Sequence, residues 1–179
     1  WGDGGVICTN DSKLNEKLRL LRNHGLDGRD NCVEFAYNSR LDTLQAIVAS
    51  HLIKKIDHIT SSRIKNAKML DKLLRPLKEL YVPDRDELNT KQVFHIYSIL
   101  VENRNELQRF LISKNIDAKI HYPVPMHLQP ASKFLGHKLG DFPISEKVSS
   151  STLSLPVHEF ISENEINKMG SEIRSFYAS

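Results

Sequence analysis

The chain has 179 residues, of which 40% are hydrophobic and 26% are charged, which is the range of an ordinary domain with a buried core. Its net charge of +3 is small, and Lys and Arg alternate with Asp and Glu, so no basic block indicates nucleic-acid binding. Cys8 and Cys32 are too few for a disulfide framework or a four-ligand zinc site. No apolar run approaches the roughly 20 residues of a membrane span, so we expect a cytoplasmic protein without membrane or nucleic-acid partners.

The first third of the chain predicts a strand, a helix and a loop. The segment Trp1–Gly5 lacks an initiator Met and opens in a glycine turn, so we expect a truncated protein or the second half of a longer one. Val6–Thr9 predicts a short strand, and Asn10–Ser12 supplies turn and cap residues. Leucines at helical spacing then predict a helix that stops at Gly25, and the polar segment Leu26–Ala36 predicts a loop.

The strongest periodic pattern follows this loop. Apolar residues recur at helical spacing between positions 44 and 74, and Asp42 with Gln45 forms a capping pair at the start. One helix over residues 42–74 would be roughly 50 Å long at about 1.5 Å per residue. This length exceeds the width of a small domain, so the pattern predicts a helix that connects two domains and ends before Pro76.

Beyond Pro83 the pattern changes to alternating strands and helices. We expect strands at Val93–Val101, Ala118–Tyr122 and Thr152–Leu155, helices at Asn105–Lys114 and Ser145–Ser150, and a last helix capped by Ser162 or Asn164. This alternation is typical of a compact α/β layer.

Two polar segments are candidates for binding. Tyr37–Ala46 places amide, hydroxyl and guanidinium donors directly before the long helix, where an anion is favoured. From the residues alone, Asp42 and Gln45 are expected to cap the helix, and an arginine such as Arg40 is more often a surface ion pair. The segment Gly2–Gly5 precedes a strand, so it does not match a nucleotide-binding glycine loop and is expected to be a tight turn.

The second candidate is His121–Pro130, which is stiffened by prolines and rich in hydrogen-bonding side chains. Its two histidines, His121 and His127, have neither carboxylate nor thiol between them and are not at the i, i+4 spacing of a helical metal pair. We therefore expect no metal site. A rigid loop that contacts a polar substrate and a solvated structural loop both remain open.

These segments, in this order, resemble the DegT/DnrJ/StrS family of sugar aminotransferases over essentially the whole chain. The resemblance rests on five motifs: the glycine turn and strand of Gly2–Thr9, L-R-N-H-G at Leu21–Gly25, Y-N-x-R-[LM]-D-x-[LI]-Q-A at Tyr37–Ala46, H-Y-P…H-L-Q-P at His121–Pro130, and S-L-P within Leu153–Pro156. Any one of these motifs is weak evidence, whereas the ordered set is strong.

The resemblance implies an α/β protein of the pyridoxal-phosphate-dependent transferase fold type I. Residues 1–75 would be the end of the large cofactor-binding domain with the long connecting helix, and residues 76–179 the small C-terminal α/β domain. The enzymes of this family are homodimers with active sites at the subunit interface. They use pyridoxal phosphate to move an amino group, usually from glutamate, to a keto group of a nucleotide-linked sugar.

By the same resemblance, Asn38 would bind the cofactor phosphate in the partner subunit's site, and Arg40 would hold an anionic group of the substrate there. His121 and Tyr122 would line that site from across the dimer. The lysine that carries the cofactor is expected just upstream of Trp1, so no lysine of this chain takes the catalytic position. We therefore expect the 179-residue chain alone to be inactive.

Two other interpretations remain. The first is a regulatory or dehydratase-like relative of the same fold, in which the lysine is lost. A lysine a few residues before Trp1 would favour catalysis, and a histidine there would favour the dehydratase branch. The second is an α/β interaction domain in which the motifs occur by coincidence. Which sugar, carbon and nucleotide are used depends on loops that the missing half is expected to contribute in part.

Overall fold

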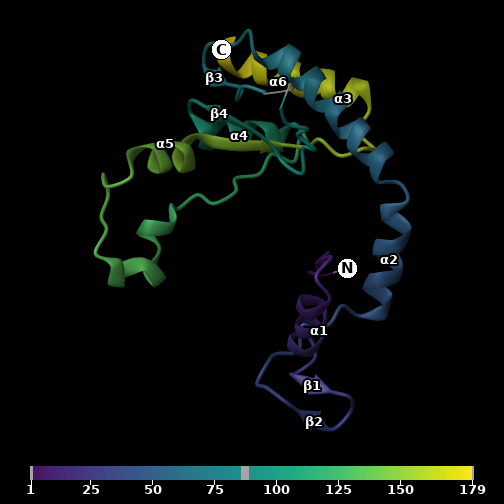
Figure 1. Ribbon diagram of the computed structural model, residues 1–179. Coiled ribbons are helices and arrows are strands. Elements are labelled where there is room, and N and C mark those ends of the chain that lie inside the picture. Colours follow the sequence, from purple (N-terminus) through teal and green to yellow (C-terminus); the bar gives the residue numbers. More distant parts are fainter. Residues whose placement is uncertain (1, 86–88, 179) are drawn as a thin grey trace. The chain divides into compact units, whose positions relative to one another are not determined.

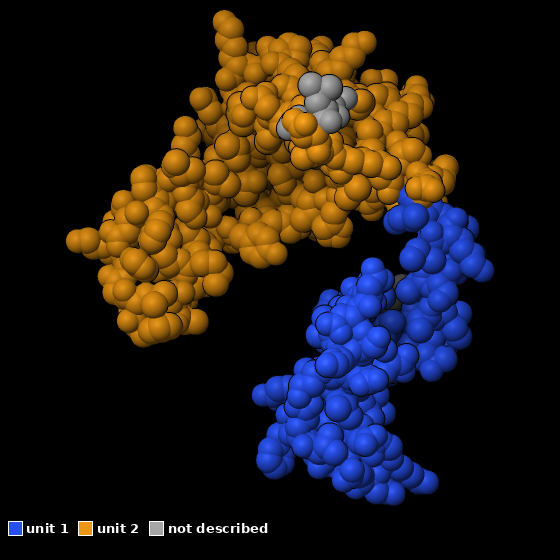
Figure 2. All heavy atoms as spheres, in the orientation of Figure 1, with its two compact units in different colours: residues 1–56 blue, residues 57–179 orange. Residues whose placement is uncertain are grey.

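The computed structural model describes residues 2–85 and 89–178. The chain forms two compact units, Trp1–Ile56 and Asp57–Ser179, which Figure 2 shows in blue and orange. Each unit is described by itself below. The expected division of the full fold at residues 75 and 76 remains a prediction.

Unit 1 begins with a capped helix, α1 (Ser12–Leu21). The Asp11 carboxylate accepts hydrogen bonds from the backbone N–H groups of Lys13 and Leu14 at 2.9 and 3.1 Å. The helix stops where Gly25, at φ +71°, donates its N–H to the carbonyl of Leu20 at 2.9 Å. The predicted helix and its glycine stop are therefore confirmed.

The predicted loop after Gly25 contains a small antiparallel hairpin of β1 (Leu26–Asp27) and β2 (Asn31–Cys32). The predicted strand at residues 6–9 is wrong: the structure has no strand there, and Val6 and Ile7 are 78% and 72% exposed. A strand is stabilised by pairing with a neighbour, and no described strand pairs with this segment.

The prediction of a single long helix is also wrong, because two helices occupy the segment: α2 (Thr43–Ile53) and α3 (Ile56–Leu74). They are separated at Lys54 and Lys55. The Lys55 N–H donates to the Leu52 carbonyl at 2.9 Å, three residues back, which tightens the turn and ends the first helix. The apolar spacing continues across this break, so the periodicity alone did not reveal it.

Unit 2 is built on a three-stranded antiparallel sheet with the order β3 (Leu80–Tyr81), β4 (Tyr97–Val101) and β5 (Thr152–Leu155). The predicted strand β5 is confirmed. Strand β4 is shorter than predicted because Phe94 has φ +50°, a left-handed conformation that no strand continues through. The predicted strand at residues 118–122 is reduced to one bridge, between Lys119 and Ser154.

Three helices pack with this sheet around one core, as the upper part of Figure 1 shows for α3 and α6 (Glu163–Ala178). The third is α4 (Arg104–Ser113), close to its predicted bounds. Each of these helices and two of the strands contribute side chains to the core, which include Leu70 and Leu74 of α3, Tyr97 and Ile99 of β4, Leu107 and Leu111 of α4, Leu153 of β5, and Ile166 and Ile173 of α6. Unit 2 therefore has a hydrophobic core of its own.

The last helix is capped as predicted. The Ser162 hydroxyl accepts the backbone N–H of Glu165 at 3.3 Å, and the Glu165 carboxylate accepts the backbone N–H of Ser162 at 2.8 Å. Between Ile120 and β5, the chain runs through two short 3₁₀ segments, Met126–Leu128 and Pro130–Leu135, and then α5 (Pro143–Ser151). Each of these segments begins at a proline or directly after one, at Pro125, Pro130 and Pro143.

Candidate active site

The segment around Asn38 is fixed to the end of α1 by backbone hydrogen bonds. His24 donates its N–H to the Tyr37 carbonyl at 3.0 Å, and Ser39 donates to the Arg22 carbonyl at 2.8 Å. These bonds make an isolated bridge between Asn23 and Asn38. The side chains of residues 37–40 are exposed, so a rigid backbone presents them to the surface.

Asn38 and Arg40 form a defined pair. The Asn38 carboxamide oxygen accepts the backbone N–H of Arg40 at 3.3 Å and its Nε–H at 3.1 Å. Because both Arg40 groups are donors, the oxygen of the amide must face Arg40, and the Nδ2 amino group must face away. Among the described residues, no group accepts from Nδ2 and no carboxylate pairs with the guanidinium of Arg40.

The start of α2 next to this pair is capped as the sequence predicts. The Asp42 backbone N–H donates to the Gln45 side chain at 3.3 Å within a capping box, and Gln45 also donates to the Asp3 carbonyl at 3.1 Å. Asp42 and Gln45 are thus engaged in structure, as expected. Asn38 and Arg40, in contrast, leave hydrogen-bond donors exposed.

His121 and Tyr122 lie next to each other in unit 2, with their ring centroids 6.5 Å apart. The Nδ1 atom of His121 lies 2.9 Å from the hydroxyl of Ser154, which is buried in β5. Tyr122 has φ +54° and is 82% exposed. One side chain is therefore held against the sheet while its neighbour points into solvent.

The structure thus brings together Asn38 with Arg40 in unit 1 and His121 with Tyr122 in unit 2. The roles expected for these four residues in cofactor and substrate binding remain predictions.

Sequence reasoning missed the partners of the two loop histidines. Besides the Ser154 contact of His121, the Nε2 atom of His127 lies 3.0 Å from the Glu146 carboxylate. Partial desolvation alone would raise the pKa of Glu146, but N–H donors of Gly140 and Phe142 and the imidazole of His127 outweigh it and lower the pKa. These contacts join residues far apart in the chain, so no local pattern marked them, although a serine between two buried leucines of β5 was a signal.

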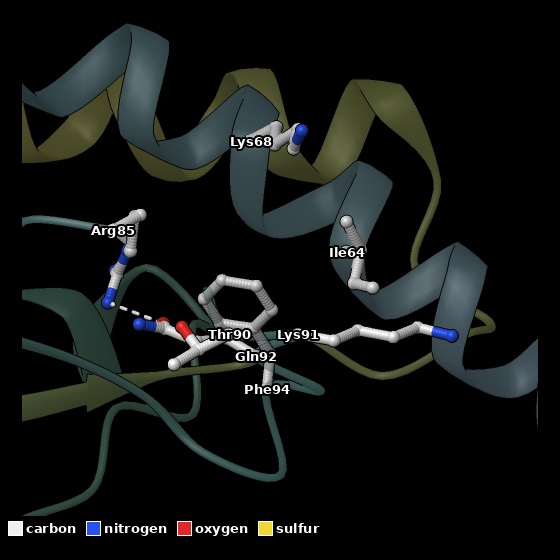
Figure 3. Close-up of a pocket in the computed structure, with 7 residues that line it drawn as sticks. All are labelled: Ile64, Lys68, Arg85, Thr90, Lys91, Gln92 and Phe94. Atoms are coloured by element: carbon white, nitrogen blue, oxygen red, sulfur yellow. Dashed lines mark hydrogen bonds between the residues drawn. The ribbon is translucent and has the colours of Figure 1, made fainter. Parts of the chain in front are cut away.

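Unit 2 also has a pocket of about 180 Å³ beside α3, shown in Figure 3. Its lining combines apolar Ile64 and Phe94 with basic Lys68, Arg85 and Lys91. The Arg85 guanidinium is already committed, since it donates to both carboxylate oxygens of Asp71 and to Gln92, each at 3.3 Å. None of the residues that the sequence singled out for binding lines this pocket.

Two absences hold for the part of the chain that the structure describes. No group of three or more His, Cys, Asp and Glu side chains is arranged to hold a metal ion. No helix there combines the length and the apolar composition that crossing a membrane requires.

Comparisons with known proteins bear on this arrangement. The pleiotropic regulatory protein of Geobacillus stearothermophilus is 38% identical over 178 residues, which cover 99% of this chain and 48% of that protein. The dTDP-3-amino-3,6-dideoxy-alpha-D-galactopyranose transaminase of Aneurinibacillus thermoaerophilus is 34% identical, over 93% of this chain and 45% of the transaminase. This chain therefore spans about half the length of the relatives it matches.

Solved structures agree with the sequence comparison. DesV of S. venezuelae, determined in complex with a ketimine intermediate, superimposes with a TM-score of 0.88 at 30% identity, over 94% of this chain and 45% of DesV. A DegT DnrJ EryC1 StrS aminotransferase from Brucella abortus gives a TM-score of 0.85 at 32% identity, over 96% of this chain and 45% of that one. The expected fold class, the α/β fold of the pyridoxal-phosphate-dependent sugar aminotransferases, is confirmed. Residues 1–174 match the DegT/DnrJ/EryC1/StrS aminotransferase family, and the chain belongs to that family.

Proposed function

We propose that the full-length protein is a pyridoxal-phosphate-dependent aminotransferase that moves an amino group, from glutamate, to a keto group of a nucleotide-linked sugar. The single observation that carries this proposal is the family match over residues 1–174. Relatives named as transaminases of dTDP-linked and UDP-linked sugars support the substrate class. We further propose that it works in the cytoplasm as a homodimer with shared active sites.

The exposed pair of Asn38 and Arg40 fits the phosphate of the cofactor and an anionic substrate group. The Nδ2 amino group of Asn38 offers two N–H donors, and Arg40 offers a guanidinium with no carboxylate partner among the described residues. The Asn38–Arg40 hydrogen bonds orient both groups before any ligand arrives, which lowers the entropy cost of binding. We assign Asn38 to the cofactor phosphate and Arg40 to the substrate, both in the partner subunit's site.

His121 and Tyr122 would contact the sugar nucleotide from the small domain. The imidazole of His121 and the exposed phenol of Tyr122 can each donate or accept a hydrogen bond. When bound, pyridoxal phosphate supplies the electron sink for the carbon that gains or loses the amino group. The residues of this chain would bind and orient the two substrates around it.

A substitution at Asn38 tests the cofactor assignment. In the full-length protein, Asn38→Asp replaces two N–H donors by a negative charge, so we expect roughly 10- to 100-fold weaker binding of pyridoxal phosphate. Binding is measured by titrating the apoprotein and following cofactor absorbance, and transamination of a dTDP- or UDP-linked keto-sugar is measured in parallel.

Asn105→Asp is the matched control, because Asn105 is also an exposed asparagine that accepts a hydrogen bond from a neighbouring arginine, Arg104, at 2.8 Å. We expect this variant to bind the cofactor as the wild type does. Equal cofactor affinity of the Asn38→Asp variant and the wild type would contradict the assignment.

A regulatory role is the second candidate, because the Geobacillus relative is named a pleiotropic regulatory protein. We favour the enzyme, since several relatives over the same residues are named transaminases. The residue at the motif position, four or five residues before Trp1, separates the two: a lysine there supports catalysis, and its absence supports the regulatory or dehydratase-like alternative.

A further inference from the structure

A line of three side chains connects the core of unit 2 to His121. The hydroxyls of Ser98 and Ser154 lie 2.9 Å apart, and the Ser154 hydroxyl lies 2.9 Å from Nδ1 of His121. Ser98 and Ser154 are directly opposite each other in the register of β4 and β5, so both side chains stand on one face of the sheet. We call these three residues the Ser–Ser–His line.

The backbone holds the same three elements together. The N–H of Ser154 donates to the Lys119 carbonyl at 2.8 Å, and the N–H of Lys119 donates to the Ser154 carbonyl at 2.9 Å. Ser154 therefore fixes the chain two residues before His121 with its backbone and the imidazole itself with its side chain. Ser154 thus holds the segment 119–121 at Lys119 and at the His121 ring. The next residue, Tyr122, points into solvent.

Burying the hydroxyl of Ser154 destabilises the fold unless the hydroxyl is hydrogen-bonded. The residue is 4% exposed and lies between the buried Leu153 and Leu155. A buried hydroxyl without a partner destabilises a protein, whereas Ala or Val would fill such a position without that cost. The hydrogen bond to His121 gives the hydroxyl a partner. It also restrains the imidazole of this loop residue, because Ser154 is fixed in the core.

A hydroxyl suits Nδ1 in both forms of the ring. It donates to Nδ1 when that nitrogen is unprotonated and accepts from it when it carries a proton, and Ser98 compensates by rotating its own hydroxyl. The imidazole thus keeps its orientation whichever nitrogen carries the proton. The Nε2 atom of His121 bonds to none of the described residues, so it is the atom that the line leaves for a ligand.

We propose that Ser154, supported by Ser98, is a positioning residue that holds Nδ1 of His121 so that Nε2 is presented to the sugar nucleotide. The identity of the ligand in this inference rests on the proposed function. The positioning of His121 rests on the geometry of the three residues. Ser154 acts through His121 and does not itself touch the substrate.

The first experiment tests the link without measuring activity. NMR of the ¹⁵N-histidine-labelled 179-residue chain reports the ring nitrogens, and His121→Gln identifies the signals of His121. We expect Ser154→Ala to shift the His121 ring signals and to leave those of His127 in place, because His127 bonds to Glu146 instead. Unchanged His121 signals in Ser154→Ala would overturn the inference.

The second experiment tests the role in the full-length enzyme with a double-mutant cycle. We expect Ser154→Ala to lower kcat/KM for the sugar nucleotide about tenfold. In the His121→Gln background the same change should have no further effect, because its consequence passes through the missing imidazole. Ser154→Thr, which keeps the hydroxyl, should restore most of the activity.

Ser150→Ala is the control, since that hydroxyl bonds only to the Lys147 carbonyl, at 2.9 Å, on the surface of α5. Thermal unfolding of each variant separates a loss of folding from a loss of positioning. Additive losses in the cycle, or no rescue by Ser154→Thr in a folded protein, would overturn the role of Ser154. A wild-type enzyme without transaminase activity would overturn the proposed function instead, and the NMR result would still decide the link.

Discussion

The carboxylate of Asp71 is a buried charge that joins several side chains of unit 2. Its carboxylate is 9% exposed and accepts the Tyr97 hydroxyl at 2.7 Å and two N–H groups of Arg85 at 3.3 Å. The Arg85 guanidinium also lies over the rings of Phe94 and Tyr97, 5.1 and 5.5 Å from their centroids. A buried carboxylate is tolerated only when it is paired and hydrogen-bonded, so each donor matters.

Removing one donor tests this cluster. Tyr97→Phe keeps the ring and deletes the hydroxyl, so we expect a loss of about 1–3 kcal/mol in the free energy of unfolding, measured by urea denaturation. Tyr81→Phe is the control, because Tyr81 is exposed and its hydroxyl makes no hydrogen bond to the described residues. Equal stability of the two variants would show that the Tyr97 hydroxyl contributes nothing.

Tyr97 should also make the stability of the protein depend on pH in the alkaline range. Burial, followed by the hydrogen bond to Asp71 and its negative charge, raises the pKa of Tyr97 above its usual value of about 10. In the unfolded chain this phenol ionises near pH 10, whereas the folded protein keeps its proton. The resulting stability is complete below about pH 10 and is lost as the pH rises towards the folded pKa. Stability should therefore fall less steeply above pH 10 in Tyr97→Phe.

At the scale of elements, Gly25 decides whether the turn after α1 can form. A Cβ atom added there would lie 1.7 Å from the Glu34 carbonyl oxygen, whereas one added at Gly28 would meet nothing within 4 Å. Both glycines have positive φ, at +71° and +78°. Alanine at Gly28 should thus cost only about 1–2 kcal/mol of backbone strain, and alanine at Gly25 should also displace the hairpin.

Hydrogen exchange distinguishes the two variants. The Val33 N–H donates to the Gly25 carbonyl at 2.9 Å, so it reports whether the hairpin stays closed. We expect Gly25→Ala to abolish protection at Val33 and Gly28→Ala to retain most of it. Retained protection in Gly25→Ala would mean that the backbone adjusts to the overlap.

Helices and strands could be predicted from the sequence where a local pattern within the element itself indicates them. The caps at Asp42 and Ser162 and the strand at residues 152–155 are local patterns, and all were confirmed. The break at Lys54 was missed because the apolar spacing does not change there. The strand at residues 6–9 failed because a strand needs a neighbour, and the link of Ser154 to His121 depends on tertiary packing alone.

At the scale of the whole molecule, the two units differ in what they bury. Unit 2 encloses a hydrophobic core, but unit 1 has no fully buried apolar side chain among its described residues. Its exposed apolar side chains include Val6, Ile7, Phe35, Tyr37, Leu44 and Ile47. Burying apolar surface is the main source of stability, so we expect other parts of the full-length protein to cover them.

The isolated chain should therefore be inactive. The proposed function places the cofactor lysine outside these 179 residues and assigns Asn38 to the partner subunit's site. We expect the 179-residue chain mixed with pyridoxal phosphate to give no stable yellow complex that borohydride reduces. A stable reducible complex would mean that a lysine of this chain, such as Lys13 or Lys17, takes the catalytic position.

The central claim is that Asn38 of one subunit serves a site whose lysine belongs to the other. Subunit complementation tests it directly: full-length Asn38→Asp protein is mixed with protein in which the upstream lysine is replaced by alanine, and mixed dimers are allowed to form. One site of each mixed dimer then combines an intact lysine with an intact partner Asn38, so we predict transaminase activity well above that of either parent. Activity no higher than the parents in verified mixed dimers would contradict the shared site.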